Sequence, residues 1–561
     1  MESRRLAGPV DLPNELLKVI FDDLPDDTIY NLASTCKDLH FCVLPVFLER
    51  NGLRITSSEH ISLVNPSKAA LRAFGRSLFT QNLRSISFHP NADLTRLLSD
   101  LRTLRRMVEF MPEITELTLR YSSFNWLVHS KRYHDQAQLD VENWRLELAE
   151  LLDVALAKSC RCLLMYGANH ISLKYPNLSG SSSQTDGSLP HTIHAGDPHL
   201  GQILPKSLYQ LAGCKLLSIF GKPWGNSLKL ASSTTPAMRQ SPSTARKSED
   251  VEPTFERSIE QFTPPTFSVL TTFHIHSQML LQPPLLHWTQ SRLQLSAATL
   301  TDLSLNVDSN SLHTWTPVFS KLNIPALSKF ELICDQLVQP TDVHFRNVIA
   351  FLGRHRSLTS LHLYGLALPL PCDLSPLHYK PPILPGLTSL TAHPSFVAWF
   401  FNCDAPFVYE PFPSVMVSSE FSWFEYDLFD EALMTLASRP ETDMKLALRF
   451  VTGNGVDKWM QKHVSLGHSR SCLSSLRSVK QLSIHSHHSL KLTFSEEVVK
   501  ILPSLLALFP SLEDVTFAEQ SLWVDQLIDG LVKEVETSCP RIKLFSVDTL
   551  PTGLEEYQPD D

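Results

Sequence analysis

The chain has 561 residues, 43% of them hydrophobic. Because one hydrophobic core rarely exceeds about 250–300 residues, this length predicts several domains or an extended array of repeats. The net charge of −9 and the isoelectric point near 6.2 argue against sequence-independent binding of nucleic acid, because such binding needs a basic surface. We find no apolar signal-peptide core, no run long enough to span a membrane and no paired CxxC motif, and so expect a cytoplasmic or nuclear protein.

The predicted elements begin with a short helix that follows Asp11. Pro13 suits the first helical position and Glu15 lies in the first turn, where a negative charge complements the helix dipole. Pro25 ends the helix, because the residue before a proline avoids the α region. The apolar side chains between these points fall along one stripe: Leu16, Leu17, Ile20, Phe21 and Leu24.

Two more short helices complete this N-terminal unit. Asp26 or Asp27 caps the second, and a third segment carries Leu39, Val43 and Leu44 before Pro45 interrupts it. The apolar positions of the second recur at helical spacing: Ile29, Leu32, Ala33 and Cys36. Three helices of this size do not bury every apolar side chain, so we expect part of the stripe to face a partner.

This pattern resembles the F-box, whose motif begins Leu-Pro-x-Glu-Leu-Leu-x-x-Ile-Phe-x-x-Leu. The matching residues here are Leu12, Pro13, Glu15, Leu16, Leu17, Ile20, Phe21 and Leu24. The tryptophan that many members carry near the end of the motif is absent, and Phe47 lies nearby. The resemblance implies docking on a Skp-type adaptor, with contacts from Leu12, Pro13, Glu15, Leu16, Ile20, Phe21, Leu24 and Leu32. The alternative is an amphipathic helical hairpin that packs on the rest of the chain.

A short motif, apolar-x-x-apolar-x-apolar, recurs about every 30 residues behind this unit. It occurs at Leu83/Ile86/Phe88, Ile114/Leu117/Leu119, Leu270/Phe273/Ile275, Leu300/Leu303/Leu305, Leu327/Phe330/Leu332, Leu358/Leu361/Leu363, Leu387/Leu390/Ala392, Val479/Leu482/Ile484, Leu512/Val515/Phe517 and Ile542/Phe545/Val547. Amphipathic helical stretches lie between these motifs. The pattern is less regular near Ala168/Ile171/Leu173 and Cys214/Leu217/Ile219, and residues 400–475 show no clear motif.

The repeating motif resembles the leucine-rich repeat. The resemblance implies an α/β fold: a three-helix F-box followed by an irregular solenoid with parallel strands inside and helices outside. The asparagine that the family places three residues after the last leucine is found only as Asn91, so the turns need another source of hydrogen bonds. The alternative is a compact α/β domain whose leucines follow this spacing by chance.

These patterns divide the chain into five regions. We expect an F-box at 1–55, a first set of irregular repeats at 56–177 and the main repeat region at 269–550. Residues 178–268 are rich in Ser, Thr, Pro and Gly and predict a mostly disordered insertion with a short apolar island. Residues 551–561 form an acidic tail.

Few residues of the chain match a known catalytic or metal-binding pattern. Cys160 and Cys162 have no second pair, and a histidine-rich turn at 485–488 is more often solvated than metal-bound, so we expect no metal and no cofactor. Strand side chains alternate between faces, which places one group of residues on the inner, concave face of the repeats. This candidate substrate-binding group is His274, His276, Glu331, His362, Tyr364, His393 and His485.

The sequence therefore predicts a non-enzymatic substrate receptor of an SCF-type ubiquitin ligase. By resemblance, its partners are a Skp-type adaptor, the cullin and RING subunits reached through it, and a protein substrate held by the repeats. Holding the target near the ubiquitin-loaded enzyme accelerates transfer by proximity. The alternative is a scaffold that binds the adaptor without ubiquitin transfer; an enzyme with an unrecognised site in the repeats is a third hypothesis.

Overall fold

The computed structural model describes most of the chain outside one long insertion. The described ranges are 14–75, 77–90, 94–121, 134–167, 269–282, 285–307, 309–338, 342–366, 368, 382–402, 414–419, 426–439, 443–450, 455–486, 496–518 and 525–547. All of them belong to one compact unit, formed by Met1–Ser172 and Pro264–Asp561. The predicted insertion at 178–268, the weak repeats within it and near Ala168, and the acidic tail at 551–561 lie outside the described residues.

Three helices open the described chain: α1 (Asn14–Asp22), α2 (Asp26–Ala33) and α3 (Lys37–Arg50). Ile29 and Ala33 of α2 are buried, as are four apolar residues of α3, and the rings of Tyr30 and Phe47 lie 5.5 Å apart. Pro45 does not interrupt the third helix, which continues to Arg50. The carbonyl that loses its donor to a proline is that of the residue four earlier, here the exposed Phe41, where water can replace the bond.

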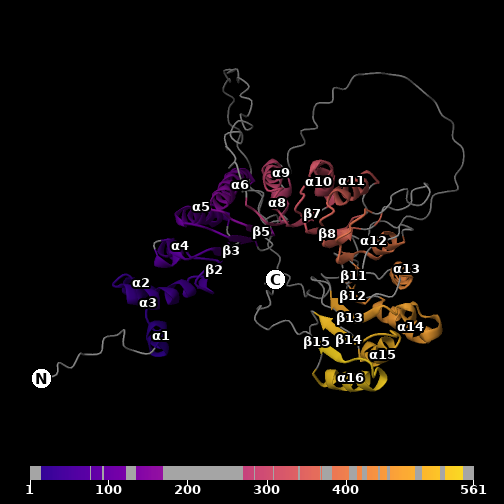
Figure 1. Cartoon of the computed structure of the whole chain (residues 1–561). Coiled ribbons are helices and arrows are strands. Elements are labelled where there is room, and N and C mark those ends of the chain that lie inside the picture. Colours follow the sequence, from indigo (N-terminus) through magenta and orange to yellow (C-terminus); the bar gives the residue numbers. More distant parts are fainter. Residues whose placement is uncertain are drawn as a thin grey trace, which may run out of the picture. The chain divides into compact units, whose positions relative to one another are not determined.

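Fifteen described strands form one sheet in which each strand pairs with the next along the chain (Figure 1). β1 and β2 pair antiparallel, and all later pairs are parallel. The strands are β1 (Leu53–Ile55), β2 (His60–Val64), β3 (Ser85–His89), β4 (Glu116–Arg120), β5 (Cys162–Tyr166), β6 (Thr272–His276), β7 (Asp302–Val307), β8 (Lys329–Val338), β9 (Ser360–Leu366), β10 (Ser389–Ala392), β11 (Ser414–Ser418), β12 (Met444–Phe450), β13 (Val479–Ser486), β14 (Asp514–Ala518) and β15 (Leu544–Val547).

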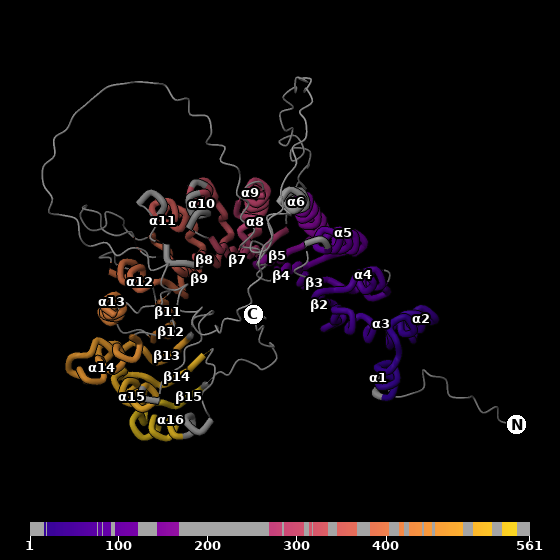
Figure 2. The backbone as a smooth tube through the Cα atoms, turned by 180° about the vertical axis from the view of Figure 1, so that it is seen from behind, coloured from indigo at the N-terminus to yellow at the C-terminus, as the bar shows by residue number. Residues whose placement is uncertain are grey.

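Helices connect most of these strands and lie on one side of the sheet in both views (Figures 1 and 2). They are α4 (Lys68–Gly75), η2 (Leu78–Gln81), α5 (Leu94–Phe110), α6 (His134–Ala157), α8 (Gln278–Leu281), α9 (Leu285–Leu295), α10 (Ser309–Lys321), α11 (Asp342–Arg354), α12 (Pro394–Phe401), α13 (Tyr426–Ala437), α14 (Val456–Arg470), η3 (Cys472–Ser475), α15 (Glu496–Leu506) and α16 (Asp525–Ser538). The described part is therefore a mixed α/β, solenoid-like fold with a mostly parallel sheet.

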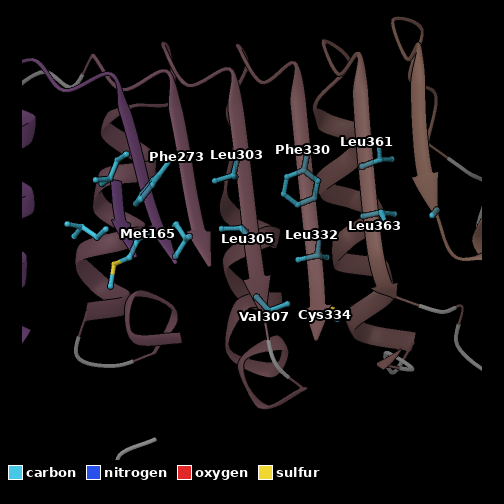
Figure 3. Packing of buried hydrophobic residues seen from close by; sticks show 14 of the residues in the cluster. Met165, Phe273, Leu303, Leu305, Val307, Phe330, Leu332, Cys334, Leu361 and Leu363 are labelled. Carbon is cyan, nitrogen blue, oxygen red and sulfur yellow. The ribbon is translucent and has the colours of Figure 1, made fainter. Parts of the chain in front are cut away.

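The core consists of two rows of apolar side chains that run across the sheet toward the helices. Figure 3 shows residues of both rows; the first has Phe273, Leu303, Phe330 and Leu361 on successive strands. The second row contains Ile275, Leu305, Leu332 and Leu363, and every residue of both rows is fully buried. These residues occupy the second and third apolar positions of the motif. In each of the ten motifs these two positions lie on a strand of the sheet, so the predicted strands are confirmed.

Five strands of the structure were not predicted by the ten motifs: β1, β2, β5, β11 and β12. In β5 the first motif position holds Cys160, which is buried like the leucines that it replaces, and in β12 it holds Asp443. β2 and β11 likewise fall outside the ten motifs, and β11 and β12 occupy the part of 400–475 where no repeat was expected. β5 pairs directly with β6, so the two predicted repeat regions contribute to one continuous sheet.

Serine and threonine side chains form a ladder of hydrogen bonds at the start of the strands, the opposite end from the asparagine position of the motif. Just before successive strands, a hydroxyl donates to a main-chain carbonyl of the preceding repeat, as from Thr301 to Thr271 (3.1 Å) and from Thr359 to Ser328 (3.0 Å). The main-chain N–H of the same residue donates to that carbonyl as well. The set, which we call the hydroxyl ladder, comprises Thr115, Thr271, Thr301, Ser328, Thr359 and Thr388.

Candidate functional site

The first helix divides its apolar residues between the core and the surface. Leu17 and Phe21 are 4% and 5% exposed, whereas Leu16, Val19 and Ile20 are 53%, 62% and 46% exposed. The spacing explains the division, because residues four apart lie on the same helix face. We call Leu16, Val19 and Ile20 the α1 apolar patch. Exposed large apolar side chains grouped in this way mark interaction surfaces more often than isolated ones do.

Arg50, at the end of α3, holds the C-terminal end of α1 in place. Its Nη2 donates to the carbonyls of Phe21 (2.8 Å) and Asp22 (2.5 Å), and its Nη1 donates to that of Leu24 (2.7 Å). The last carbonyls of a helix have no partner within the helix, so a guanidinium that reaches several of them caps it. The same guanidinium lies 3.4 Å from the carboxylate of Asp26.

The structure places the predicted adaptor contacts in different environments. Leu16 and Ile20 are exposed, and Leu24 and Leu32 are half-buried against the core. Phe21 is buried within the chain, because it faces α3 rather than solvent, and it supports the helix instead of offering a surface. Leu12 and Pro13 and the side chain of Glu15 lie outside what the structure describes. Val19 and Phe41 of α3 are also exposed, although neither was among the predicted contacts.

A second surface lies on the sheet face that does not carry the two buried rows. We call it the polar face. Strand alternation places His274, Ser304, Glu331 and His362 at aligned positions on β6, β7, β8 and β9. Tyr166 and His276 are paired two positions further on, across β5 and β6. The structure thus brings five of the seven predicted substrate-binding residues together: His274, His276, Glu331, His362 and Tyr364.

Hydrogen bonds and ion pairs connect these side chains across the strands. His276 Nε2 lies 2.6 Å from Ser304 Oγ, and Ser304 Oγ donates to Glu331 Oε2 at 2.6 Å. Glu331 Oε1 lies 3.8 Å from His362 Nδ1. A neighbouring group begins at Asp302, whose two carboxylate oxygens each lie 3.2 Å from a partner: His274 Nε2 and Lys329 Nζ. The polar face is therefore internally paired, which holds its side chains in fixed positions.

The carboxylates of the polar face stay ionised well below neutral pH. Burial alone would raise the pKa of Glu331, but its interactions with His362 and Ser304 and the charge of His276 outweigh burial and lower the pKa to about 2. The pKa of Asp302 is lowered in the same way, by His274 and Lys329 against the effect of burial. The polar face therefore carries two fixed negative charges, surrounded by histidines and one lysine, with which the polar side chains of a partner protein can interact.

The contact between Ser304, His276 and Glu331 does not form a nucleophilic site. In a Ser–His–acid triad the acid orients the histidine, which removes the proton of the serine. Here the serine hydroxyl donates to Glu331, so the hydrogen bond with His276 Nε2 has the imidazole N–H as its donor. His276 is thus not positioned as a base toward Ser304.

Three predicted substrate contacts differ from expectation: His393 and His485 lie apart from the five residues above, and Tyr364, one of the five, is buried. His393 is not on the polar face: β10 ends at Ala392, and His393 is buried as the N-cap of α12, where its side chain accepts from the N–H of Ser395. The reason is Pro394, which suits the first turn of a helix and ends the strand. His485 lies on β13, separated from β9 by three strands, with Nε2 3.0 Å from Ser483 Oγ. Tyr364 is buried, with the guanidinium of Arg449 5.1 Å from its ring centroid.

Several polar-face residues escaped the sequence analysis. Asp302 and Lys329 stand one position before the first buried row, and Ser304 and Tyr166 stand between or after the buried residues. Arg120 extends the surface, since its guanidinium lies 5.4 Å from the Tyr166 ring centroid, and that ring is 5.0 Å from the ring of His276. These residues stand at the alternate positions of the strands, which all face the same side of the sheet. The prediction considered only the aromatic and imidazole side chains at such positions and therefore did not include them.

One cluster away from the sheet has the residue types of a metal site. Ligand atoms of Asp430, His463 and Cys472 lie within 4.8 Å of one another. Asp430, however, already accepts from Trp459 Nε1 (2.8 Å), Lys462 Nζ (2.8 Å) and His463 Nε2 (3.0 Å). Burial raises the pKa of the Cys472 thiol to about 12, and a metal binds the thiolate. The cluster is a hydrogen-bonded link between α13, α14 and η3.

No family model matches the chain, and no curated protein sequence matches it. Among the helices within the described ranges, none combines the length and the apolar character that crossing a membrane requires. The geometry of the two surfaces is therefore the basis for any assignment of function.

Proposed function

We propose that the chain is the substrate-recognition subunit of an SCF-type ubiquitin ligase. Its N-terminal three-helix unit, an F-box, binds a Skp-type adaptor, and the polar face of its leucine-rich-repeat sheet binds the target protein. The chain supplies no acid, base or nucleophile, and ubiquitin transfer is accelerated by proximity.

The α1 apolar patch is the observation that carries the proposal. Leu16 and Ile20 occupy two of the positions at which the sequence resembles the F-box motif, and both are about half exposed while their neighbours Leu17 and Phe21 are buried. Exposing a leucine and an isoleucine on one helix face costs free energy that a partner surface recovers. Arg50 fixes the patch relative to α2 and α3, so the surface is preorganised for docking.

The polar face supports the second half of the proposal. Its side chains stand on adjacent strands of a rigid sheet and carry both signs of charge, which gives a partner directional hydrogen bonds and ion pairs. Repeat sheets of this kind bind partners along their strands. The hydrogen-bond direction at Ser304 argues against the alternative of a hydrolytic enzyme at this place.

Affinity purification tests the proposal. The intact protein is compared with Leu16→Glu/Ile20→Glu and with the control Met434→Glu/Leu544→Glu, which changes two apolar residues that are each 54% exposed elsewhere. We expect adaptor, cullin and RING subunits to be lost only with the α1 variant, and targets to be retained by it. Recovery of the adaptor without cullin would favour a scaffold, and recovery of ligase subunits with the α1 variant would overturn the proposal.

Replacing His274, His276 and His362 together with alanine tests the polar face separately. We expect this variant to keep the adaptor and lose the target. Unchanged target capture would show that the target binds elsewhere on the chain.

A further inference from the structure

A pocket of about 390 Å³ lies between α4 and α5, next to the N-terminal helices and away from the polar face. α4 and α5 are neighbours in both views (Figures 1 and 2). The buried side chains of Leu71 and Met107 line the pocket. The size falls within the range of small-ligand and peptide side-chain pockets. Neither the adaptor patch nor the polar face accounts for it.

Two rows of cations line this pocket. Lys68 and Arg72 stand four residues apart on α4, and Arg102 and Arg106 stand four apart on α5, so each pair projects from one helix face. All four are exposed. No carboxylate occurs among the described residues that line the pocket, although the whole chain carries a net charge of −9. The pocket is thus a local positive site on an acidic protein.

Three of these cations have no ionic partner within the described part of the chain. Arg102 donates to Glu147 at 3.1 Å, but Lys68, Arg72 and Arg106 make no such contact there. Like charges held close together destabilise a protein unless an anion neutralises them. The hydroxyls of Ser99 and Thr103 donate to main-chain carbonyls, so the cations are the groups available to an anionic ligand.

The surroundings of the pocket limit what that ligand can be. Next to the pocket, where α5 contacts α6, the partly exposed carboxylates of Glu109 and Glu150 lie around Arg105. They would repel a broad anionic surface such as a bilayer or a nucleic-acid duplex. A narrow anionic chain that enters the pocket would instead meet the two rows of cations, with no carboxylate among the described lining residues. Phe110, at the end of the pocket on α5, is 79% exposed and offers an apolar contact beside the cations.

We propose that this pocket binds an acidic peptide segment of a partner protein. Carboxylates of the segment pair with Lys68, Arg72 and Arg106, and an adjoining apolar side chain packs on Phe110. The site goes beyond the proposed receptor function and does not depend on it, because it is separate from both the α1 apolar patch and the polar face.

Fluorescence anisotropy with the full-length chain tests the site. The probe is a labelled peptide that alternates glutamate with serine and ends in leucine, and the control peptide has glutamine for each glutamate. We expect saturable binding of the acidic peptide alone, weakened when salt is raised from about 0.05 M to about 0.5 M. Absence of binding up to about 1 mM peptide would overturn the proposal.

Matched variants separate the pocket from general charge. Arg72→Glu/Arg106→Glu should weaken binding by about tenfold or more, and Arg72→Gln/Arg106→Gln by a smaller factor, with the thermal unfolding of each checked first. Lys458→Glu/Lys533→Glu makes the same charge change at exposed lysines of α14 and α16 and should leave binding unchanged. Equal loss in this control would refute the site. So would saturable binding of pyrophosphate or of phosphatidylserine vesicles without binding of the peptide.

Discussion

Arg50→Ala should release the first helix from the N-terminal unit. The substitution removes the bonds to the carbonyls of Phe21, Asp22 and Leu24, at 2.8, 2.5 and 2.7 Å. A hydrogen bond that involves a charged group contributes about 1.5–3 kcal/mol, and water replaces part of this at the exposed carbonyls. We therefore expect a local loss of about 3 kcal/mol. A helix of nine residues does not persist alone, so α1 should unfold when it detaches.

Hydrogen exchange measures this loss directly. A fall of about 3 kcal/mol in the free energy of local opening should make the amides of α1 exchange about 100-fold faster, with those of the repeat strands unchanged. Arg50→Lys should restore little, because an ammonium does not reproduce the fork of donors. Arg54→Ala, at an exposed arginine of β1, is the control. Wild-type protection of α1 in Arg50→Ala, or an equal effect in Arg54→Ala, would refute the capping role.

Three further predictions concern the repeats. Thr359→Val should lower the urea midpoint, because it loses about 1 kcal/mol of folding free energy with the hydroxyl donor to the Ser328 carbonyl. Thr359→Ser keeps that donor and should be nearly neutral. Equal effects of the two substitutions would contradict the stabilising role of the hydroxyl ladder. The pKa of Glu331 is lowered from 4.5 to about 2, so its ionised form stabilises the fold above pH 4.5, and this contribution is lost as the pH falls through about 2. In urea unfolding, the stability difference between the wild type and Glu331→Gln should therefore shrink as the pH falls over that range. A constant difference would contradict this account. Asp430→Asn should lower the melting temperature while a chelator leaves the wild type unchanged, and a chelator-induced fall would point to a metal instead.

Much of the repeat sheet follows from the spacing of apolar residues. The second and third positions of each motif, such as Phe330 and Leu332, point toward the helices, and alternation alone places Glu331 between them on the other face. Two of the strands that were not predicted have a polar or cysteine residue at the first position: Asp443 in β12 and Cys160 in β5. A search that requires only the two strand positions would tolerate such changes.

Other features depend on contacts that no local pattern contains. Arg50 reaches carbonyls 26 to 29 residues earlier in the chain, and nothing in its own neighbourhood indicates that role. His393 matched the spacing of the polar face but caps a helix, because a proline directly after it ends the strand. The division of α1 into a buried side at Phe21 and an exposed side at Ile20 was likewise decided by where α3 packs.

The affinity of the intact chain for a purified Skp-type adaptor tests the central claim most directly. Docking would bury the exposed halves of Leu16 and Ile20, which contributes about 2–3 kcal/mol, and a glutamate at each position adds the cost of burying a charge. Titration calorimetry should show binding that weakens by at least about 100-fold in Leu16→Glu/Ile20→Glu and stays unchanged in Met434→Glu/Leu544→Glu. No binding by the wild type, or equal binding by the α1 variant, would contradict the assignment of this unit as an adaptor-binding F-box.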